Sequence, residues 1–183
     1  MKKAFLIHGF NGFPNSAWLP WLMKELKSRD IYAASLAMPT PDMPKKIEWI
    51  KEIERHIDNS KTEEICLVGH SLGCAAILNY LQSENSKDVK GIVLVSGRFL
   101  KSSNILTQEF YEYFDFKKIK SKVKNIFIIH GDKDNFVNVE NAYLLGEKLD
   151  VEPIIIKDAG HFTTGEGYLE LRECLESLIK IIG

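Results

Sequence analysis

The sequence predicts an α/β protein with a six-stranded parallel sheet and helices on both faces of the sheet. Six short apolar segments bounded by turn residues alternate with amphipathic stretches along the chain. Most of these apolar segments lack the apolar–polar alternation of a half-exposed strand, so they suit strands that helices cover on both faces. Regular alternation of strand and helix favours a parallel sheet with right-handed crossovers.

The expected elements follow from this pattern. The strand candidates are residues 3–8, 31–37, 64–69, 91–96, 125–130 and 152–157. The helix candidates are residues 16–28, 44–59, 71–83, 138–149 and 167–181. In the last helix a core-facing stripe is expected at helical spacing, made of Tyr168, Leu171, Leu175, Leu178 and Ile179.

Two segments interrupt the alternation. Residues 98–123 are rich in aromatic and charged side chains and are too long for an ordinary connection, so we expect an excursion with its own helical turns. This excursion is either a small lid or pocket wall, or a layer packed on the sheet edge. Residues 38–44 contain three prolines and are predicted to form a rigid loop.

Length and composition limit the class of protein. The 183 residues suit one domain, residues 1–183, and 24 basic against 25 acidic side chains leave a net charge of −1. A net charge this close to zero gives no excess of positive charge to attract nucleic acid or an anionic membrane, so neither is expected as a partner. No apolar run is long enough for a transmembrane helix. Three cysteines are few and odd in number, which favours a reducing compartment, and we expect a cytoplasmic protein.

The motif Gly69-His70-Ser71-Leu72-Gly73 matches G-x-S-x-G. It follows a predicted strand and opens a predicted helix, which is the setting of a nucleophile elbow. The sharp turn strains the serine backbone and demands neighbours without bulk on both sides. The alternative is an ordinary glycine-rich turn with a capping serine.

A serine nucleophile needs a base and a carboxylate that orients the base, and both have candidates after later strands. His161 is the candidate base, since histidine exchanges protons near neutral pH. Asp134 is the preferred carboxylate, with Asp132 and Asp158 as rivals. The chain order Ser71, Asp134, His161 is that of a known class of catalytic triad, and the ends of parallel strands share one edge of the sheet.

The turn after the first strand offers donors for an oxyanion hole. We expect the amide N–H of Phe10, or in its place that of Asn11, to act together with the amide N–H of Leu72. Further candidates for contact with substrate are His8, Asn11, Trp18 and Phe162. For His8 a local structural role is preferred, and an aromatic residue at the helical spacing of Trp18 more often belongs to the core.

These motifs together resemble the small serine hydrolases of the α/β-hydrolase superfamily, of the retinoblastoma-binding serine hydrolase and YdeN type. The resemblance spans nearly the whole chain and rests on His8-Gly9, Trp18-Leu19-Pro20-Trp21-Leu22, Met38-Pro39-Thr40-Pro41, the elbow, Gly131-Asp132-Lys133-Asp134 and Gly160-His161-Phe162. It implies a minimal hydrolase fold with strand order 2-1-3-4-5-6 and little or no cap. The retinoblastoma-binding motif Leu-x-Cys-x-Glu is absent, because Arg172 stands at the Leu position before Cys174 and Glu176. The resemblance therefore does not imply a retinoblastoma-protein partner for this chain.

The function expected is hydrolysis of a small carboxylic ester through an acyl-enzyme, with a small-molecule acyl substrate and without metal or cofactor. An amidase, peptidase or thioesterase would use the same residues. A binding or adaptor protein on a hydrolase fold is the alternative from another class, since a fold does not dictate function. The sequence does not indicate the oligomeric state.

Overall fold

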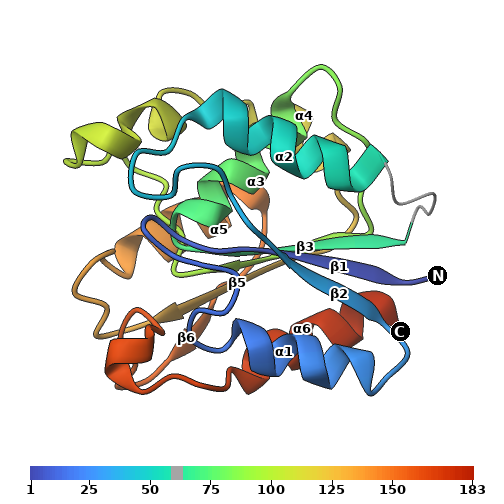
Figure 1. Cartoon of the computed structure of the whole chain (residues 1–183). Coiled ribbons are helices and arrows are strands. Elements are labelled where there is room, and N and C mark those ends of the chain that lie inside the picture. Colours follow the sequence, from blue (N-terminus) through green and yellow to red (C-terminus); the bar gives the residue numbers. More distant parts are fainter. Residues whose placement is uncertain (59–63) are drawn as a thin grey trace.

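The computed structural model describes residues 1–58 and 64–183. Within them six parallel strands form one sheet in the order β2-β1-β3-β4-β5-β6, which confirms the expected fold (Figure 1). The strands are β1 (Lys3–Ile7), β2 (Tyr32–Leu36), β3 (Ile65–His70), β4 (Gly91–Val95), β5 (Ile126–Gly131) and β6 (Ile154–Ile156).

Helices cover both faces of the sheet (Figure 1). One face carries α1 (Leu19–Lys27) and α6 (Arg172–Ile182). The other carries α2 (Lys46–Asp58), α3 (Leu72–Gln82), α4 (Phe116–Ser121) and α5 (Glu140–Leu149). Two apolar clusters fill the space between the sheet and these layers, because successive strand residues point to opposite faces.

The first and last helices begin later than expected. Ala17 has a φ of 49°, a left-handed conformation that delays the start of α1 until Leu19. Residues Thr164–Glu166 form the 3₁₀ turn η2, and Gly167 closes this turn with a φ of 83°, so α6 begins only at Arg172. Of the expected stripe on the last helix, Tyr168 and Leu171 precede the helix and Ile179 is 39% exposed. The last residue of the expected helix 44–59 lies outside the described residues.

Residues 98–123 form an excursion with its own helical turns, as expected. It contains the 3₁₀ helix η1 (Ile105–Tyr111) and α4. The Asn79 side chain of α3 donates to the Phe110 carbonyl at 2.8 Å, and the Phe110 ring is fully buried. The excursion is thereby packed onto α3.

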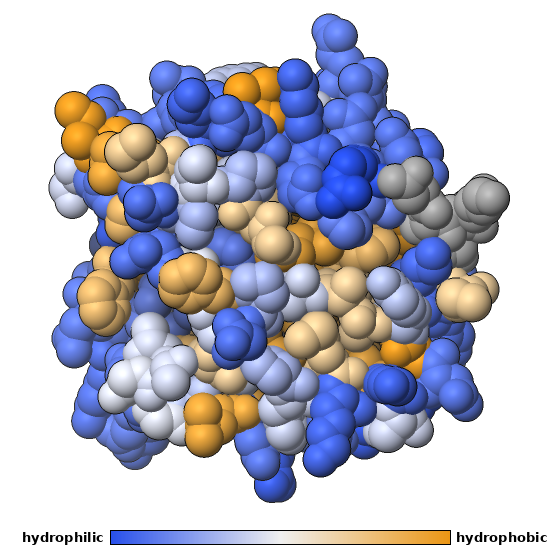
Figure 2. Space-filling view, in the orientation of Figure 1, coloured by the Kyte–Doolittle hydropathy of each residue, from blue (hydrophilic) through white to orange (hydrophobic). Residues whose placement is uncertain are grey.

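The surface in the orientation of Figure 2 is mainly hydrophilic, with apolar groups scattered over it. Among the exposed apolar side chains are Ile105 and Leu106 of η1. Across the described ranges, no helix is both long and apolar enough to cross a membrane.

Candidate active site

The G-x-S-x-G segment forms a sharp turn between β3 and α3. Ser71 has φ 53° and ψ −116°, a strained conformation for a residue other than glycine. A side chain at Gly69 would lie 2.6 Å from the amide nitrogen of Cys74, and one at Gly73 would collide with the carbonyl oxygen of Ile7. Both glycines are therefore needed for the close approach of the helix to the strand ends.

A buried hydrogen bond joins His161 to Asp134, with 2.7 Å between Nδ1 and Oδ2. The other carboxylate oxygen of Asp134 accepts the amide N–H groups of Phe136 and Val137, both at 2.8 Å. Because the carboxylate accepts the hydrogen on Nδ1, the neutral imidazole has a lone pair on Nε2. The ring is thereby prepared to take a proton at the nitrogen remote from Asp134.

The Asp134 carboxyl is held in its charged form. Burial opposes ionisation, but contacts with His130 and His161 and the backbone N–H of Val137 outweigh burial and keep the pKa of Asp134 well below its usual range. The two rival carboxylates stand apart from this arrangement. Asp132 is exposed, and Asp158 forms an ion pair with Lys133 at 2.5 Å.

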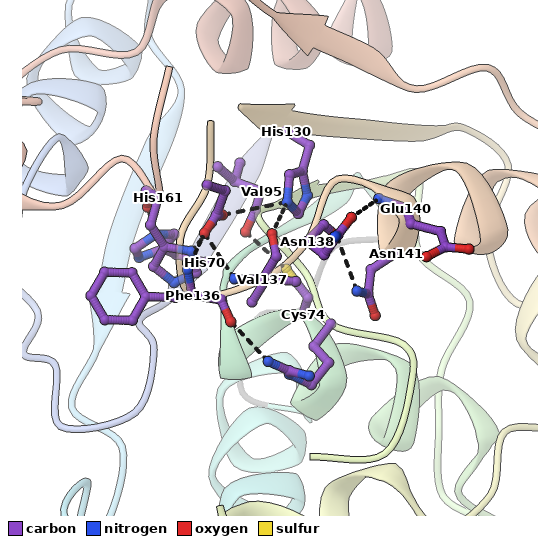
Figure 3. A network of polar contacts seen from close by, with 12 residues as sticks. His70, Cys74, Val95, His130, Phe136, Val137, Asn138, Glu140, Asn141 and His161 are labelled. Atoms are coloured by element: carbon purple, nitrogen blue, oxygen red, sulfur yellow. Dashed lines mark hydrogen bonds and ion pairs between the residues drawn. The ribbon is translucent and has the colours of Figure 1, made fainter. Parts of the chain in front are cut away.

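A second histidine lies beside this carboxylate, and it was not predicted from the sequence. His130, fully buried at the end of β5, has its Nε2 3.4 Å from Asp134 Oδ2. The same Nε2 donates to the Val137 carbonyl at 2.8 Å. Figure 3 shows the rings of His70, His161 and Phe136 gathered on one side of this network and His130 on the other. The position of His130 at a strand end was the one indication in the sequence.

Ser71 and His161 border one cavity of about 400 Å³. The cavity is lined by Phe10, Ser71, Leu72, Arg98, Ser102, Ser103, Asn104, Thr107, Tyr111, Phe136, Val137, His161 and Thr163. Part of the 98–123 excursion thus forms a wall of the cavity. Within the described residues the Ser71 hydroxyl makes no hydrogen bond, so the contact between serine and imidazole is not closed in this state.

The turn after β1 lies against the serine. A side chain at Gly9 would contact Ser71 Cβ at 3.0 Å and Oγ at 3.6 Å, which explains the glycine. The amide N–H of Asn11 donates to the Pro41 carbonyl at 2.7 Å, so it is not available for an oxyanion. The amide N–H groups of Phe10 and Leu72, by contrast, have no acceptor in the described part of the chain.

None of the four further candidates for substrate contact lines the cavity. Trp18 and Phe162 are fully buried, and Trp18 packs edge-on against His70 with ring centroids 5.8 Å apart. The buried His8 accepts the Met38 amide N–H at 3.3 Å, and Asn11 is exposed beside the proline loop. Trp18 and Phe162 fill the core between α1, α6 and the sheet, which for Trp18 is the core position that its helical spacing favoured.

His70 has a structural role close to the site. Its Nε2 donates to the His161 carbonyl at 2.8 Å, which ties the elbow to residues 157–163, the histidine loop. Burial, with a contribution from the neighbouring His161, lowers the pKa of His70 to about 4. Among the described residues no group of three or more His, Cys, Asp or Glu side chains is arranged to hold a metal ion.

Comparison with known proteins decides the family. The family model described as serine hydrolase matches residues 4–180. The chain belongs to the serine hydrolase family. Bacillus subtilis YdeN is 31% identical over 173 residues, covering 93% of this chain and 90% of that protein. The serine hydrolase RBBP9 of Rattus norvegicus is 24% identical over 97% of this chain and 95% of its own length.

Solved structures agree with the fold of this serine hydrolase. The crystal structure of YdeN superposes with a TM-score of 0.92 at 29% identity, covering 99% of this chain and 98% of YdeN. Est1E from Butyrivibrio proteoclasticus superposes with a TM-score of 0.75 at 15% identity, covering 99% of this chain and 86% of its own. The second likeness concerns the fold alone.

Proposed function

We propose that this serine hydrolase cleaves carboxylic esters through an acyl-enzyme, with Ser71 as nucleophile, His161 as base and Asp134 as its orienting carboxylate. The observation that carries the proposal is the 2.7 Å bond from His161 to Asp134 on a ring that shares a cavity wall with Ser71. That bond leaves Nε2 of His161 as the proton acceptor on the cavity side.

In the first half of the reaction, Ser71 Oγ bonds to the ester carbonyl carbon and its proton passes to His161 Nε2. The negative oxygen that forms is stabilised by the amide N–H groups of Phe10 and Leu72, which have no other acceptor in the described residues. The bond to the leaving alcohol then breaks, and His161 delivers the proton to that oxygen.

In the second half, His161 takes a proton from a water molecule, whose oxygen attacks the acyl carbon. The bond to Ser71 breaks, the serine regains its proton from His161, and the carboxylic acid departs. A rotation of the Ser71 or His161 side chain that closes the hydrogen bond between them would precede attack, since such contacts tighten when substrate is bound.

A fluorophosphonate probe tests the nucleophile. We expect it to label the wild-type protein and not Ser71→Ala, while Ser121→Ala, which changes an exposed serine of α4, remains labelled. Hydrolysis of p-nitrophenyl esters by Ser71→Ala should fall by about four to six orders of magnitude in kcat. Equal labelling of wild type and Ser71→Ala would contradict the assignment, and absence of labelling in both would favour a non-catalytic binding protein.

An ester is the proposed substrate, and the groups named above suffice for its cleavage. Amides and thioesters pass through the same acyl-enzyme, so a panel of matched ester, thioester and aminoacyl amide substrates separates these activities by kcat/KM. We also propose a cytoplasmic location. All three cysteines are buried and unpaired, which suits a reducing compartment.

A further inference from the structure

Arg98 places a positive charge in the wall of the candidate active site. It follows β4 at the carboxyl edge of the sheet and lines the same cavity as Ser71 and His161. Of the described residues that line this cavity, Arg98 alone carries a permanent charge. Its side chain is half-buried, and no carboxylate of the described residues pairs with it.

The guanidinium group is held by Phe136, a residue that also contacts His161. It donates to the Phe136 carbonyl at 2.8 Å, and the Phe136 ring lies 5.2 Å from the His161 ring, beside it in Figure 3. One of its five N–H groups is used in this bond, so the remaining donors are available to a ligand. A planar guanidinium matches a carboxylate with two parallel hydrogen bonds.

The rest of the wall is mixed, since Phe10, Leu72, Tyr111, Phe136 and Val137 line the cavity together with polar groups. Hydroxyl and amide groups contributed by the excursion and the histidine loop belong to Ser102, Ser103, Asn104, Thr107 and Thr163. A plain alkyl chain could occupy the apolar part of this wall, but over Arg98 and the hydroxyl groups it would remove water without replacing its hydrogen bonds. The unpaired guanidinium therefore favours a substrate that joins an apolar part to a negatively charged group.

We propose that the substrate of this enzyme is an ester that bears a carboxylate near the scissile bond, and that Arg98 binds this carboxylate. One positive charge balances a monoanion, which favours a carboxylate over a phosphate dianion. The inference rests on the proposed esterase function and adds the substrate class to it.

Paired esters test the proposal through kcat/KM. The wild-type enzyme should prefer p-nitrophenyl hemiglutarate to p-nitrophenyl pentanoate, which has the same chain length without charge. In Arg98→Gln the ratio of the two kcat/KM values should fall tenfold or more, and Arg98→Lys should retain part of it. Lys101→Gln is the matched control, because Lys101 is an exposed cation nearby that does not line the cavity, and its ratio should equal that of wild type.

The side of the ester that carries the charge is resolved by 4-acetoxybenzoate, whose carboxylate is on the leaving group, compared with phenyl acetate. An Arg98-dependent preference in either pair supports the proposal. A ratio that is unchanged by Arg98→Gln in both pairs overturns it, provided that thermal unfolding shows the variant to be folded.

Binding without turnover separates this inference from the proposed function. Calorimetric titration of Ser71→Ala with monomethyl glutarate should show binding that weakens tenfold or more in the double variant Ser71→Ala/Arg98→Gln. Arg98-dependent binding without any hydrolysis or labelling of the wild type would refute the esterase and leave the anion site standing. Hydrolysis and labelling with no effect of Arg98 on binding would refute the anion site alone.

Discussion

Glu166 holds the loop that presents His161, although the two residues belong to no common helix or strand. One carboxylate oxygen accepts the His161 amide N–H at 3.1 Å, and the other accepts the amide N–H and the hydroxyl of Thr163, both at 2.9 Å. Burial opposes the charge, but these N–H groups hold the pKa of Glu166 below its usual value. A charged carboxylate thus fixes the backbone on both sides of Phe162.

Replacing Glu166 with glutamine should disturb the position of His161 without removing any group that reacts. An amide nitrogen cannot accept the N–H groups that one carboxylate oxygen accepts now, so we expect kcat to fall about tenfold while KM changes less than about twofold. Steady-state kinetics with a p-nitrophenyl ester measures this division. Glu147→Gln, on the exposed side of α5, is the control. Loss of folded enzyme also lowers the apparent kcat without changing KM, so the folded fraction of each variant is measured by thermal unfolding. A fall in kcat that this fraction fully accounts for would refute a positioning role.

At the scale of elements, α3 joins the nucleophile to the wall of the cavity. Its first residue follows Ser71, and its buried Asn79 donates to the carbonyls of Ala75 and Phe110, both at 2.8 Å. Phe110 in turn packs edge-on against Trp49 of α2, with ring centroids 5.6 Å apart. One helix therefore positions both the serine turn and the excursion opposite it.

Asn79→Ala should loosen this connection. The substitution leaves the buried carbonyl of Phe110 without its donor, so we expect the free energy of unfolding to fall by about 1–3 kcal/mol. Urea denaturation measures the change. Asn125→Ala is a matched control, since the exposed side chain of Asn125 donates to the Lys90 carbonyl, and the substitution should cost no more than about 0.5 kcal/mol. Equal effects of the two variants would show that the excursion does not depend on Asn79.

For the whole molecule, stability should depend on pH through histidines that fold in their neutral form. Burial lowers the pKa of His70 to about 4 and lowers that of His8 below its ordinary value of 6.5. The unfolded chain therefore binds more protons than the native protein below about pH 6.5, so acid favours unfolding. His70 bridges the elbow and the histidine loop, so its protonation opposes the association of segments distant in the sequence.

We expect the free energy of unfolding to decrease by about 2 kcal/mol from His70 alone as the pH falls from 7 to 5. Denaturant titrations at several pH values measure this slope. His70→Gln can keep a hydrogen bond to the His161 carbonyl without titrating, so its slope should be smaller than that of wild type whatever its stability at pH 7. An unchanged slope would show that His70 is not the group responsible. The Asp134 carboxylate, with its depressed pKa, adds to the loss only below about pH 4.

Local patterns in the sequence predicted the six strands and most of the helices, while the strand order 2-1-3-4-5-6 was what the family resemblance implied. Short apolar runs and helical patterns are local, and so is the glycine-flanked motif at the Ser71 turn, so the strands and this turn were predictable from neighbouring residues. The ends of the first and last helices were not, because left-handed residues at Ala17 and Gly167 start those helices late. Asp134 and His161 were predicted as partners of Ser71 because parallel strands end at one edge of the sheet and because the chain order is that of a known triad.

Only the tertiary structure decided which side chains face the cavity. Packing brings Arg98 to Phe136, His130 to Asp134 and Glu166 to His161. It also places the Trp18 side chain in the core. The orientation of a side chain depends on contacts between elements far apart in the chain, and no local pattern records those contacts. For the same reason the sequence predicted a serine hydrolase, whereas the charge in its pocket became visible only in the folded molecule.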